Sequence, residues 1–114
     1  MNDNPAFGAG LQPFMGIPSF MCLPVSRELA GVDVAILGVP FDSGTSYRTG
    51  TRFGPRKIRE TSLMIWGHNS TVNVTPLKKL KVVDYGDVSV IPTSIEHTMA
   101  AITSMAGEII SENR

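Results

Sequence analysis

The sequence has 114 residues, of which 42% are hydrophobic and 18% are charged, a composition typical of one folded domain and not of a disordered chain. Its ten basic and ten acidic residues cancel, so no net field attracts nucleic acid or an anionic membrane, and we expect neither as a partner. The single cysteine, Cys22, excludes an internal disulfide and fits a reducing compartment.

Residues 1–30 are predicted to form an extended arm. Four prolines and three glycines make regular structure unfavourable there, because proline restricts its own backbone and that of the preceding residue. The arm nevertheless carries several large apolar side chains, too many for a free tail. We expect it to pack on another surface, for which a neighbouring subunit is a candidate.

The run "VDVAILGV" at residues 32–39 is apolar and rich in β-branched side chains, which predicts a strand buried on both faces and therefore a parallel sheet. A loop rich in Gly, Thr and Arg follows at 41–54. Pro55 suits the first turn of a helix, predicted over 55–65. One side of this helix carries Ile58, Ser62 and Ile65.

A polar connection at 66–79 leads to a second predicted strand, "LKVVDY", at 80–85. Thr93 and Glu96 have capping-box spacing and predict the start of a helix that continues to Arg114. Its apolar stripe is Ile95, Met99, Ile102, Ala106 and Ile109. The order strand, helix, strand, helix predicts an α/β fold. Because two strands are few for such a sheet, we expect the domain, residues 31–114, to be incomplete.

The glycine-rich loop resembles a phosphate-binding loop only in outline. Gly44 and Gly50 are one residue too far apart for the nucleotide-binding pattern, and Pro55 removes a donor from the start of the helix. Nucleotide binding is therefore a minor alternative.

Candidates for metal binding or catalysis are few. His68 and His97 lack ligand spacing, and both are interpreted as ordinary polar residues. Cys22, between two apolar residues, is interpreted as a packed small hydrophobe. Asp84 and Asp87 form the best acidic pair, at the end of a strand where α/β proteins bind ligands. Their favoured interpretation is structural: they cap turns and accept bonds from backbone or arginine.

Two segments carry a family resemblance. "VDVAILGVPFDSGTSYRTGTRFGPRKIRETS" and the later "LKVVDYGDVSV" resemble the ureohydrolase family of arginases and agmatinases, and "GTRFGPRKIRE" is most similar to its agmatinase and guanidinobutyrase branch. The resemblance implies a three-layer α/β/α domain with a parallel sheet. It also implies hydrolysis of a guanidino compound to urea and an amine by two Mn²⁺ ions with a bridging hydroxide.

The metal-ligand segments of that family, "GGDH", "DAHxD" and "DxDxxDP", are absent from this sequence. We therefore predict no catalytic and no metal-ligating residue here, and expect an N-terminal portion that is inactive alone. The alternative is a truncated remnant that acts as an interaction module. Agmatine, related guanidino substrates and a nickel-using relative remain open. A cytoplasmic location is expected because no secretory signal is recognisable, and the family implies a homo-oligomer when complete.

The resemblance places the loop after the first strand near the active site. Its predicted contributors to the rim of the substrate pocket are Asp42, Arg48, Gly50 and Arg52. Asp42, the only acid of the loop, is a candidate to accept a cationic substrate tail. Arg48, Arg52 and Arg56 are instead expected to form bidentate bonds with carboxylates. The alternative is structural: glycines allow tight turns and the arginines pin the loop.

Overall fold

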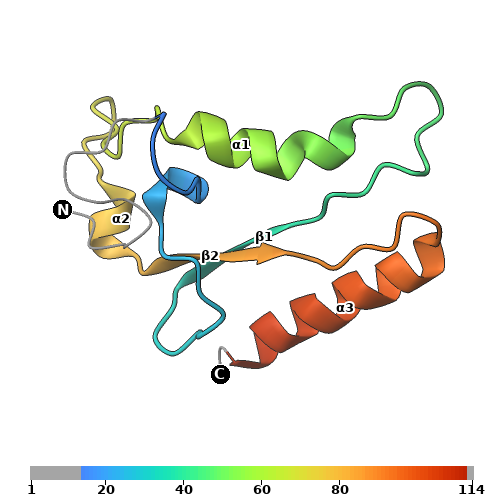
Figure 1. The fold of residues 1–114 in the computed structure, drawn as a ribbon. Helices are drawn as coiled ribbons and strands as arrows, with labels where there is room; N and C mark the ends of the chain where they lie inside the picture. The colour runs from blue at the N-terminus through green and yellow to red at the C-terminus, as the bar shows by residue number, and fades with distance from the viewer. Residues whose placement is uncertain (1–13, 113–114) are drawn as a thin grey trace.

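The computed structural model describes residues 14–112 and has three layers, with a small parallel sheet between two helices (Figure 1). The helix α1 covers one face of the sheet and α3 covers the other. In chain order the elements are η1 (Phe20–Cys22), β1 (Val34–Gly38), η2 (Thr51–Phe53), α1 (Gly54–Ser62), α2 (Pro76–Lys79), β2 (Val82–Asp87) and α3 (Ile95–Glu112). The prediction of an α/β fold with a parallel sheet is confirmed.

The strands β1 and β2 pair in parallel, with Val34 opposite Val82 and Gly38 opposite Asp87. The register shifts between Ile36 and Leu37, so β2 contains one extra residue. Gly86 follows at this irregularity with φ 89°, a conformation that a β-carbon would strain.

The outer edge of β2 is covered by part of the arm. Val25 forms a parallel bridge with Asp84. The amide of Ser26 donates to the carbonyl of Asp84 at 3.1 Å, and the amide of Asp84 donates to Pro24 at 2.9 Å. Within the described residues the arm thus packs on its own sheet. Residues 1–13 lie outside the description, and the division at residue 30 stays a prediction.

The core lies between the sheet and α3. Leu29, Val32, Val83 and Tyr85 are buried together, and Met105 and Ile109 of α3 pack against them. The predicted stripe on α3 is wrong at its start, where Ile95 and Met99 are 54% and 52% exposed. Thr98 faces inward instead, because its hydroxyl bonds both the amide and the carbonyl of Ile91.

Helix ends also differ from the predictions. Ser94, and not Thr93, caps α3, because its Oγ accepts the amide of His97 at 3.2 Å. The helix α1 ends at Ser62, three residues early. Ser62 is buried, its hydroxyl donating to Arg59 and accepting the amide of Met21, whereas Ile58 and Ile65 remain exposed. The polar connection contains the short helix α2, which the sequence did not indicate.

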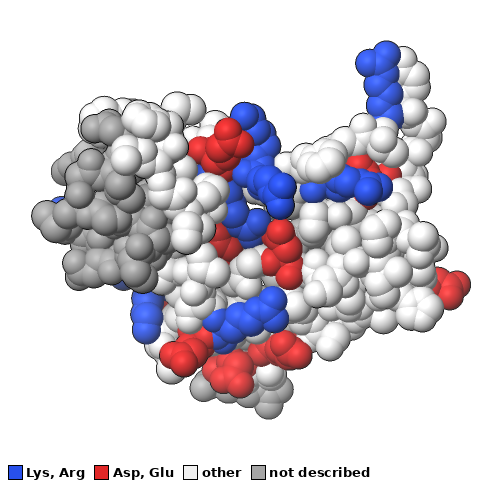
Figure 2. Space-filling view, viewed as in Figure 1, with Lys and Arg blue, Asp and Glu red and all other residues white. Residues whose placement is uncertain are grey.

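None of the helices in residues 14–112 is long and apolar enough to cross a membrane. Figure 2 shows basic and acidic side chains mixed on the face seen in Figure 1, with no broad region of one sign. This agrees with the balanced composition of the chain.

Candidate functional site

The loop between β1 and η2 is closed at its base by Asp42. One carboxylate oxygen accepts the amides of Gly50 at 2.6 Å and Arg52 at 3.2 Å, and the other accepts Arg52 Nε at 2.7 Å. Asp42 is only 3% exposed. Burial acts to raise the pKa of this carboxyl, but the bonds from Gly50 and Arg52 outweigh it, so the pKa lies below its ordinary range. Asp42 therefore remains charged and holds the loop closed.

The tip of the same loop protrudes from the body of the molecule (Figure 1). Tyr47 is 84% exposed, and the guanidinium of Arg48 lies 5.0 Å from the centre of its ring. Arg48 Nη2 also donates to the hydroxyl of Tyr47 at 3.2 Å. This pair is a stacked cation and aromatic ring on the surface, separate from the contacts of Asp42.

A second group of contacts lies at the carboxyl end of β2 and is centred on Arg59. The Nε and Nη2 atoms of Arg59 donate to the two carboxylate oxygens of Asp84 at 2.7 and 3.0 Å. Its Nη1 donates to Asp87 at 2.7 Å, and Nη2 also reaches the carbonyl of Gly86 at 2.9 Å. One arginine thus connects α1 to the last four residues of β2, and it binds Asp84 in the bidentate geometry that guanidinium favours.

The charge state of this group is fixed by its neighbours. The hydrogen bonds that Arg59 donates to Asp84 are the main cause that raises the pKa of Arg59, and they outweigh the opposing effect of burial. Burial acts to raise the pKa of Asp84, but bonds from Arg59 and from the amides of Phe20 and Gly86 lower it overall. Both carboxylate oxygens of the buried Asp84 are engaged by Arg59 and backbone amides, so this ion pair positions the backbone of β2, whereas Asp87 is partly open to solvent.

Close packing at Gly38 completes this group. A β-carbon at Gly38 would collide with the carboxylate of Asp87 and lie 2.9 Å from the Cβ of Pro55. Three elements therefore meet at a distance that only glycine permits: the end of β1, the start of α1 and the end of β2.

The predicted acidic pair, Asp84 and Asp87, does accept bonds from arginine and backbone, so the structural interpretation is confirmed. The arginine that binds this pair is Arg59, which was not singled out from the sequence. Of the three arginines expected to bond carboxylates, Arg52 bonds Asp42 through Nε alone, whereas Arg48 stacks on Tyr47 and Arg56 is exposed. The sequence signal for Arg59 was its position one helical turn beyond Pro55, on the side that faces the strand ends.

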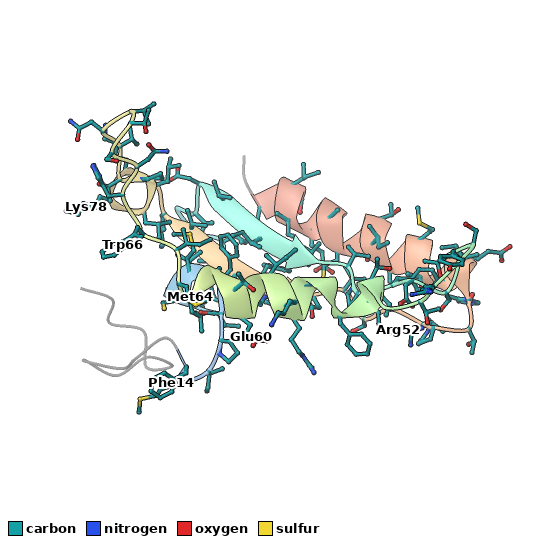
Figure 3. The ribbon with its side chains drawn as sticks, turned by 90° about the horizontal axis from the view of Figure 1, so that it is seen from above. Phe14, Arg52, Glu60, Met64, Trp66 and Lys78 are labelled. Atoms are coloured by element: carbon teal, nitrogen blue, oxygen red, sulfur yellow. The ribbon has the colours of Figure 1, made fainter. Side chains whose placement is uncertain are left out.

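Of the predicted rim residues, the structure brings Asp42, Gly50 and Arg52 together through hydrogen bonds. Arg48 lies apart from them at the tip of the loop. Arg52 lies in η2, next to the start of α1, whereas Met64 and Trp66 lie beyond the other end of α1 (Figure 3). The role of the four predicted rim residues at a substrate pocket stays a prediction.

Comparison with known proteins identifies the family. The sequence profile of the arginase family matches residues 32–114. The chain belongs to the arginase family. The predicted resemblance to ureohydrolases is thereby confirmed.

Among its arginase-family relatives, the human mitochondrial guanidino acid hydrolase is 49% identical over 76 residues, which cover 67% of this chain and 22% of the relative. The guanidinobutyrase of Pseudomonas aeruginosa is 45% identical over 92 residues, covering 78% of this chain and 27% of the relative. The chain thus spans about a quarter of the length of these curated relatives.

Solved structures give the same assignment. Proclavaminate amidino hydrolase from Streptomyces clavuligerus superposes with a TM-score of 0.83 at 33% identity, over 89% of this chain and 34% of that one. A hypothetical agmatinase from Burkholderia thailandensis superposes with a TM-score of 0.82 at 33% identity, over 90% of this chain and 32% of that one. The three-layer arrangement of residues 14–112 is therefore part of an arginase-like ureohydrolase fold.

Arginase-family enzymes are generally dependent on two metal ions, but the residues described here do not fit such a centre. No group of three or more His, Cys, Asp and Glu side chains capable of holding a metal occurs within residues 14–112. His68 bonds Thr75 at 2.8 Å and His97 bonds Ser94 at 2.7 Å. Cys22 is half-buried, and burial raises the pKa of its thiol, which disfavours the reactive thiolate.

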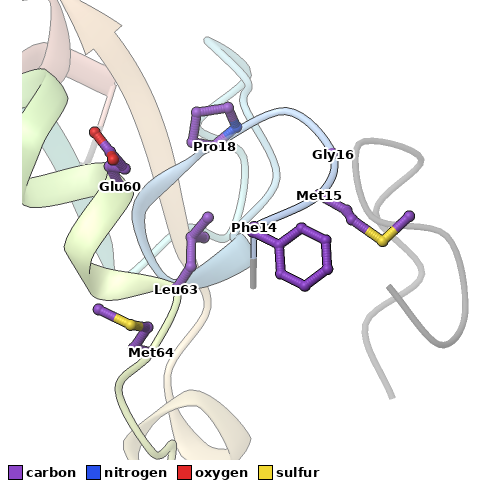
Figure 4. Close-up of a pocket in the computed structure, with 7 residues that line it drawn as sticks. All are labelled: Phe14, Met15, Gly16, Pro18, Glu60, Leu63 and Met64. Carbon is purple, nitrogen blue, oxygen red and sulfur yellow. The ribbon is translucent and has the colours of Figure 1, made fainter. Parts of the chain in front are cut away.

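A hollow between the arm and α1 shares no lining residue with either group of contacts. It has a volume of about 490 Å³ and is lined by Phe14, Met15, Gly16, Pro18, Glu60, Leu63 and Met64 (Figure 4). Glu60 is its single ionisable residue, so the hollow offers an apolar surface without a set of converging polar groups.

Proposed function

We propose that this chain is the N-terminal portion of a metal-dependent ureohydrolase that converts a linear guanidino compound to urea and an amine. The observation that carries the proposal is the 45% identity over 92 residues to a guanidinobutyrase, supported by the fold shared with proclavaminate amidino hydrolase. Both names describe hydrolysis at a guanidino or amidino group, and both proteins extend well beyond the matched segment.

The sheet itself supports a location for the active site. The helix α1 lies on one face and α3 on the opposite face, an arrangement typical of a doubly wound sheet whose connections reverse direction. In such sheets ligands bind beyond the carboxyl ends of the strands, next to the point of reversal. Here that point is the carboxyl end of β1, where the loop held by Asp42 begins.

The charges left exposed on this loop support a substrate with an acidic tail. The carboxylate of Asp42 is buried and already accepts three bonds, so it has little capacity for a cationic tail such as that of agmatine. Arg48 is exposed, and the side chain of Arg52 is 39% exposed. We propose that these two arginines favour the carboxylate of a guanidino acid.

The metal requirement belongs to the same proposal. Two Mn²⁺ ions in the complete enzyme would supply a hydroxide nucleophile, and their ligands would come from outside residues 14–112. Accordingly, the 114-residue chain alone is proposed to be inactive. The role assigned to its own residues is positional: Asp42 fixes the loop and Arg59 fixes the end of β2. A cytoplasmic location and a homo-oligomeric complete enzyme remain part of the proposal.

A chimera tests this function. Residues 32–114 replace the matching segment of the Pseudomonas aeruginosa guanidinobutyrase, and urea release is measured with Mn²⁺ from 4-guanidinobutyrate and from agmatine. We expect the chimera to release urea, with 4-guanidinobutyrate favoured, and the 114-residue chain to release none. A folded chimera with no activity on either substrate would contradict the proposal. A preference for agmatine would contradict only the assignment of the acidic tail.

A further inference from the structure

The turn at residues 19–23 of the arm holds two residues in a left-handed backbone conformation. Met21 has φ 49° and Cys22 has φ 61°, and neither of them is glycine. This conformation is unfavourable for a residue with a side chain, because the β-carbon comes too close to the following carbonyl oxygen. Such residues persist in folded proteins only where the surrounding contacts fix them.

Three hydrogen bonds inside the turn depend on this conformation. The amide of Leu23 donates to the carbonyl of Phe20 at 3.0 Å, and the amide of Cys22 donates to the carbonyl of Ser19 at 3.4 Å. The hydroxyl of Ser19, which is 1% exposed, donates to the carbonyl of Leu23 at 2.7 Å. Relaxation of Met21 and Cys22 to negative φ would therefore separate these partners and open the turn.

Two acceptors on the body of the domain hold the turn in place. The amide of Phe20 donates to Oδ2 of Asp84 at 2.9 Å, and the amide of Met21 donates to the hydroxyl of Ser62 at 2.8 Å. Successive amides of a turn can point to one side in this way and bind oxygen atoms. The two bonds attach the arm to β2 and to α1, and they hold the turn against its strain.

Few apolar contacts fasten this part of the arm. Within residues 19–26 the only buried hydrophobic residue is Leu23, and the core cluster starts further along the chain, at Leu29. The body has contacts of its own, because Arg59 engages both carboxylate oxygens of Asp84. Segments held by backbone hydrogen bonds with little buried apolar surface open locally at low free energy.

We propose that residues 19–26 form a strap that opens from β2 while the rest of the domain stays folded. The closed strap covers the outer edge of β2, and the open strap releases two acceptors, the carboxylate of Asp84 and the hydroxyl of Ser62. Because Met21 and Cys22 relax on opening, their strain favours the open state and opposes the hydrogen bonds that close it. The proposal rests on these backbone contacts and not on the hydrolase activity.

Hydrogen exchange of single amides in the 114-residue chain tests the strap. We expect the amides of Phe20, Met21 and Ser26 to exchange together, roughly a hundredfold faster than the amide of Met105 within α3. Their exchange should also respond only weakly to low concentrations of urea, because local opening exposes little surface.

Two variants at Cys22 separate the strain from the loss of the side chain. Cys22→Gly removes the thiol and the strain, whereas Cys22→Ala removes only the thiol, so the two variants differ by the β-carbon. We expect the strap amides of the glycine variant to exchange roughly threefold to tenfold more slowly than those of the alanine variant. Glu28→Gly, at an exposed arm residue outside the left-handed region, is the control and should not slow exchange.

A further variant addresses the contact with α1. Ser62→Ala removes the acceptor of the Met21 amide, and we expect exchange of this amide to become roughly tenfold faster without a change at Met105. Strap amides that exchange no faster than Met105 would overturn the proposal, because the strap would then open only when the whole domain unfolds. Equal exchange in Cys22→Gly and Cys22→Ala would overturn the role assigned to the strain.

Discussion

Substitution of Arg59 by alanine is expected to destabilise the fold more than any surface change. The side chain of Arg59 is 13% exposed and that of Asp84 is 2% exposed, so their ion pair is largely removed from water. After the substitution the carboxylate of Asp84 keeps only the amides of Phe20 and Gly86 as donors. A buried charge deprived of its partner costs about 3–5 kcal/mol of unfolding free energy.

The other pair of Arg59 adds little to this value. The side chain of Asp87 is 40% exposed, and ion pairs open to solvent contribute about 0–1 kcal/mol. Since small domains unfold with about 5–15 kcal/mol, Arg59→Ala removes a large share of the stability. With a urea dependence of about 1–3 kcal/mol per molar, the midpoint of unfolding should fall by roughly 2 M.

Urea unfolding at pH 7, followed by circular dichroism, measures this effect. Asp87→Asn is the control for the exposed pair and should cost about 1 kcal/mol or less. The double variant Arg59→Met with Asp84→Asn should be more stable than Arg59→Met alone, because no charge is left without a partner. A cost of Arg59→Ala below about 1 kcal/mol, or no recovery in the double variant, would refute the reasoning.

Four further outcomes follow from the same contacts. Gly38→Ala should cost about 1–3 kcal/mol because its methyl group meets Asp87 and Pro55, whereas Gly44→Ala, with open space around it, should be close to neutral in urea unfolding. Thr98→Val should cost about 1–3 kcal/mol by leaving the amide of Ile91 without its acceptor, and the exposed Thr103→Val should not. Asp42→Ala in the guanidinobutyrase chimera should lower urea release by roughly tenfold to a hundredfold because the loop loses its anchor, and should speed exchange of the Gly50 amide; full activity would contradict this. Because the folded pKa values of Asp42 and Asp84 lie below the ordinary value of about 3.9, the stability they provide is complete above that pH and is lost as the pH falls through the lower folded values, so equal unfolding free energies at pH 6 and pH 2 would be inconsistent with both assignments.

The elements that the sequence predicted are those whose signal is local. The apolar runs at 32–39 and 80–85 overlap β1 and β2, and Pro55 lies in the first turn of α1, because these patterns depend on neighbours along the chain. The ends of the elements depended on contacts from elsewhere. The helix α1 ends where Ser62 meets the amide of Met21, 41 residues away, and no pattern within the helix encodes this partner.

The pairing of the arm with β2 could not be predicted from the sequence for the same reason. Prolines and glycines indicated irregular backbone for the arm, and apolar side chains indicated packing, but the surface to be covered could be any exposed edge. Two backbone bonds to Asp84 show that the segment from Pro24 to Ser26 packs on the sheet of its own chain. Backbone pairing of an isolated segment has no side-chain signature, since every residue except proline offers the same donor and acceptor.

The loop after β1 shows why charge counted along a sequence differs from charge available to a ligand. Asp42 was predicted as an acceptor for a cationic tail because it is the only acid among several arginines. Asp42 lies eight and ten residues before Gly50 and Arg52, and the loop folds back to bring them together. The three hydrogen bonds that its carboxylate then accepts leave little capacity to accept a bond from a ligand. Folding thus hides the acid and leaves Arg48 exposed, which reverses the sign of the accessible charge. This difference in accessible charge is the reason why the proposed substrate has a carboxylate tail and not an ammonium tail.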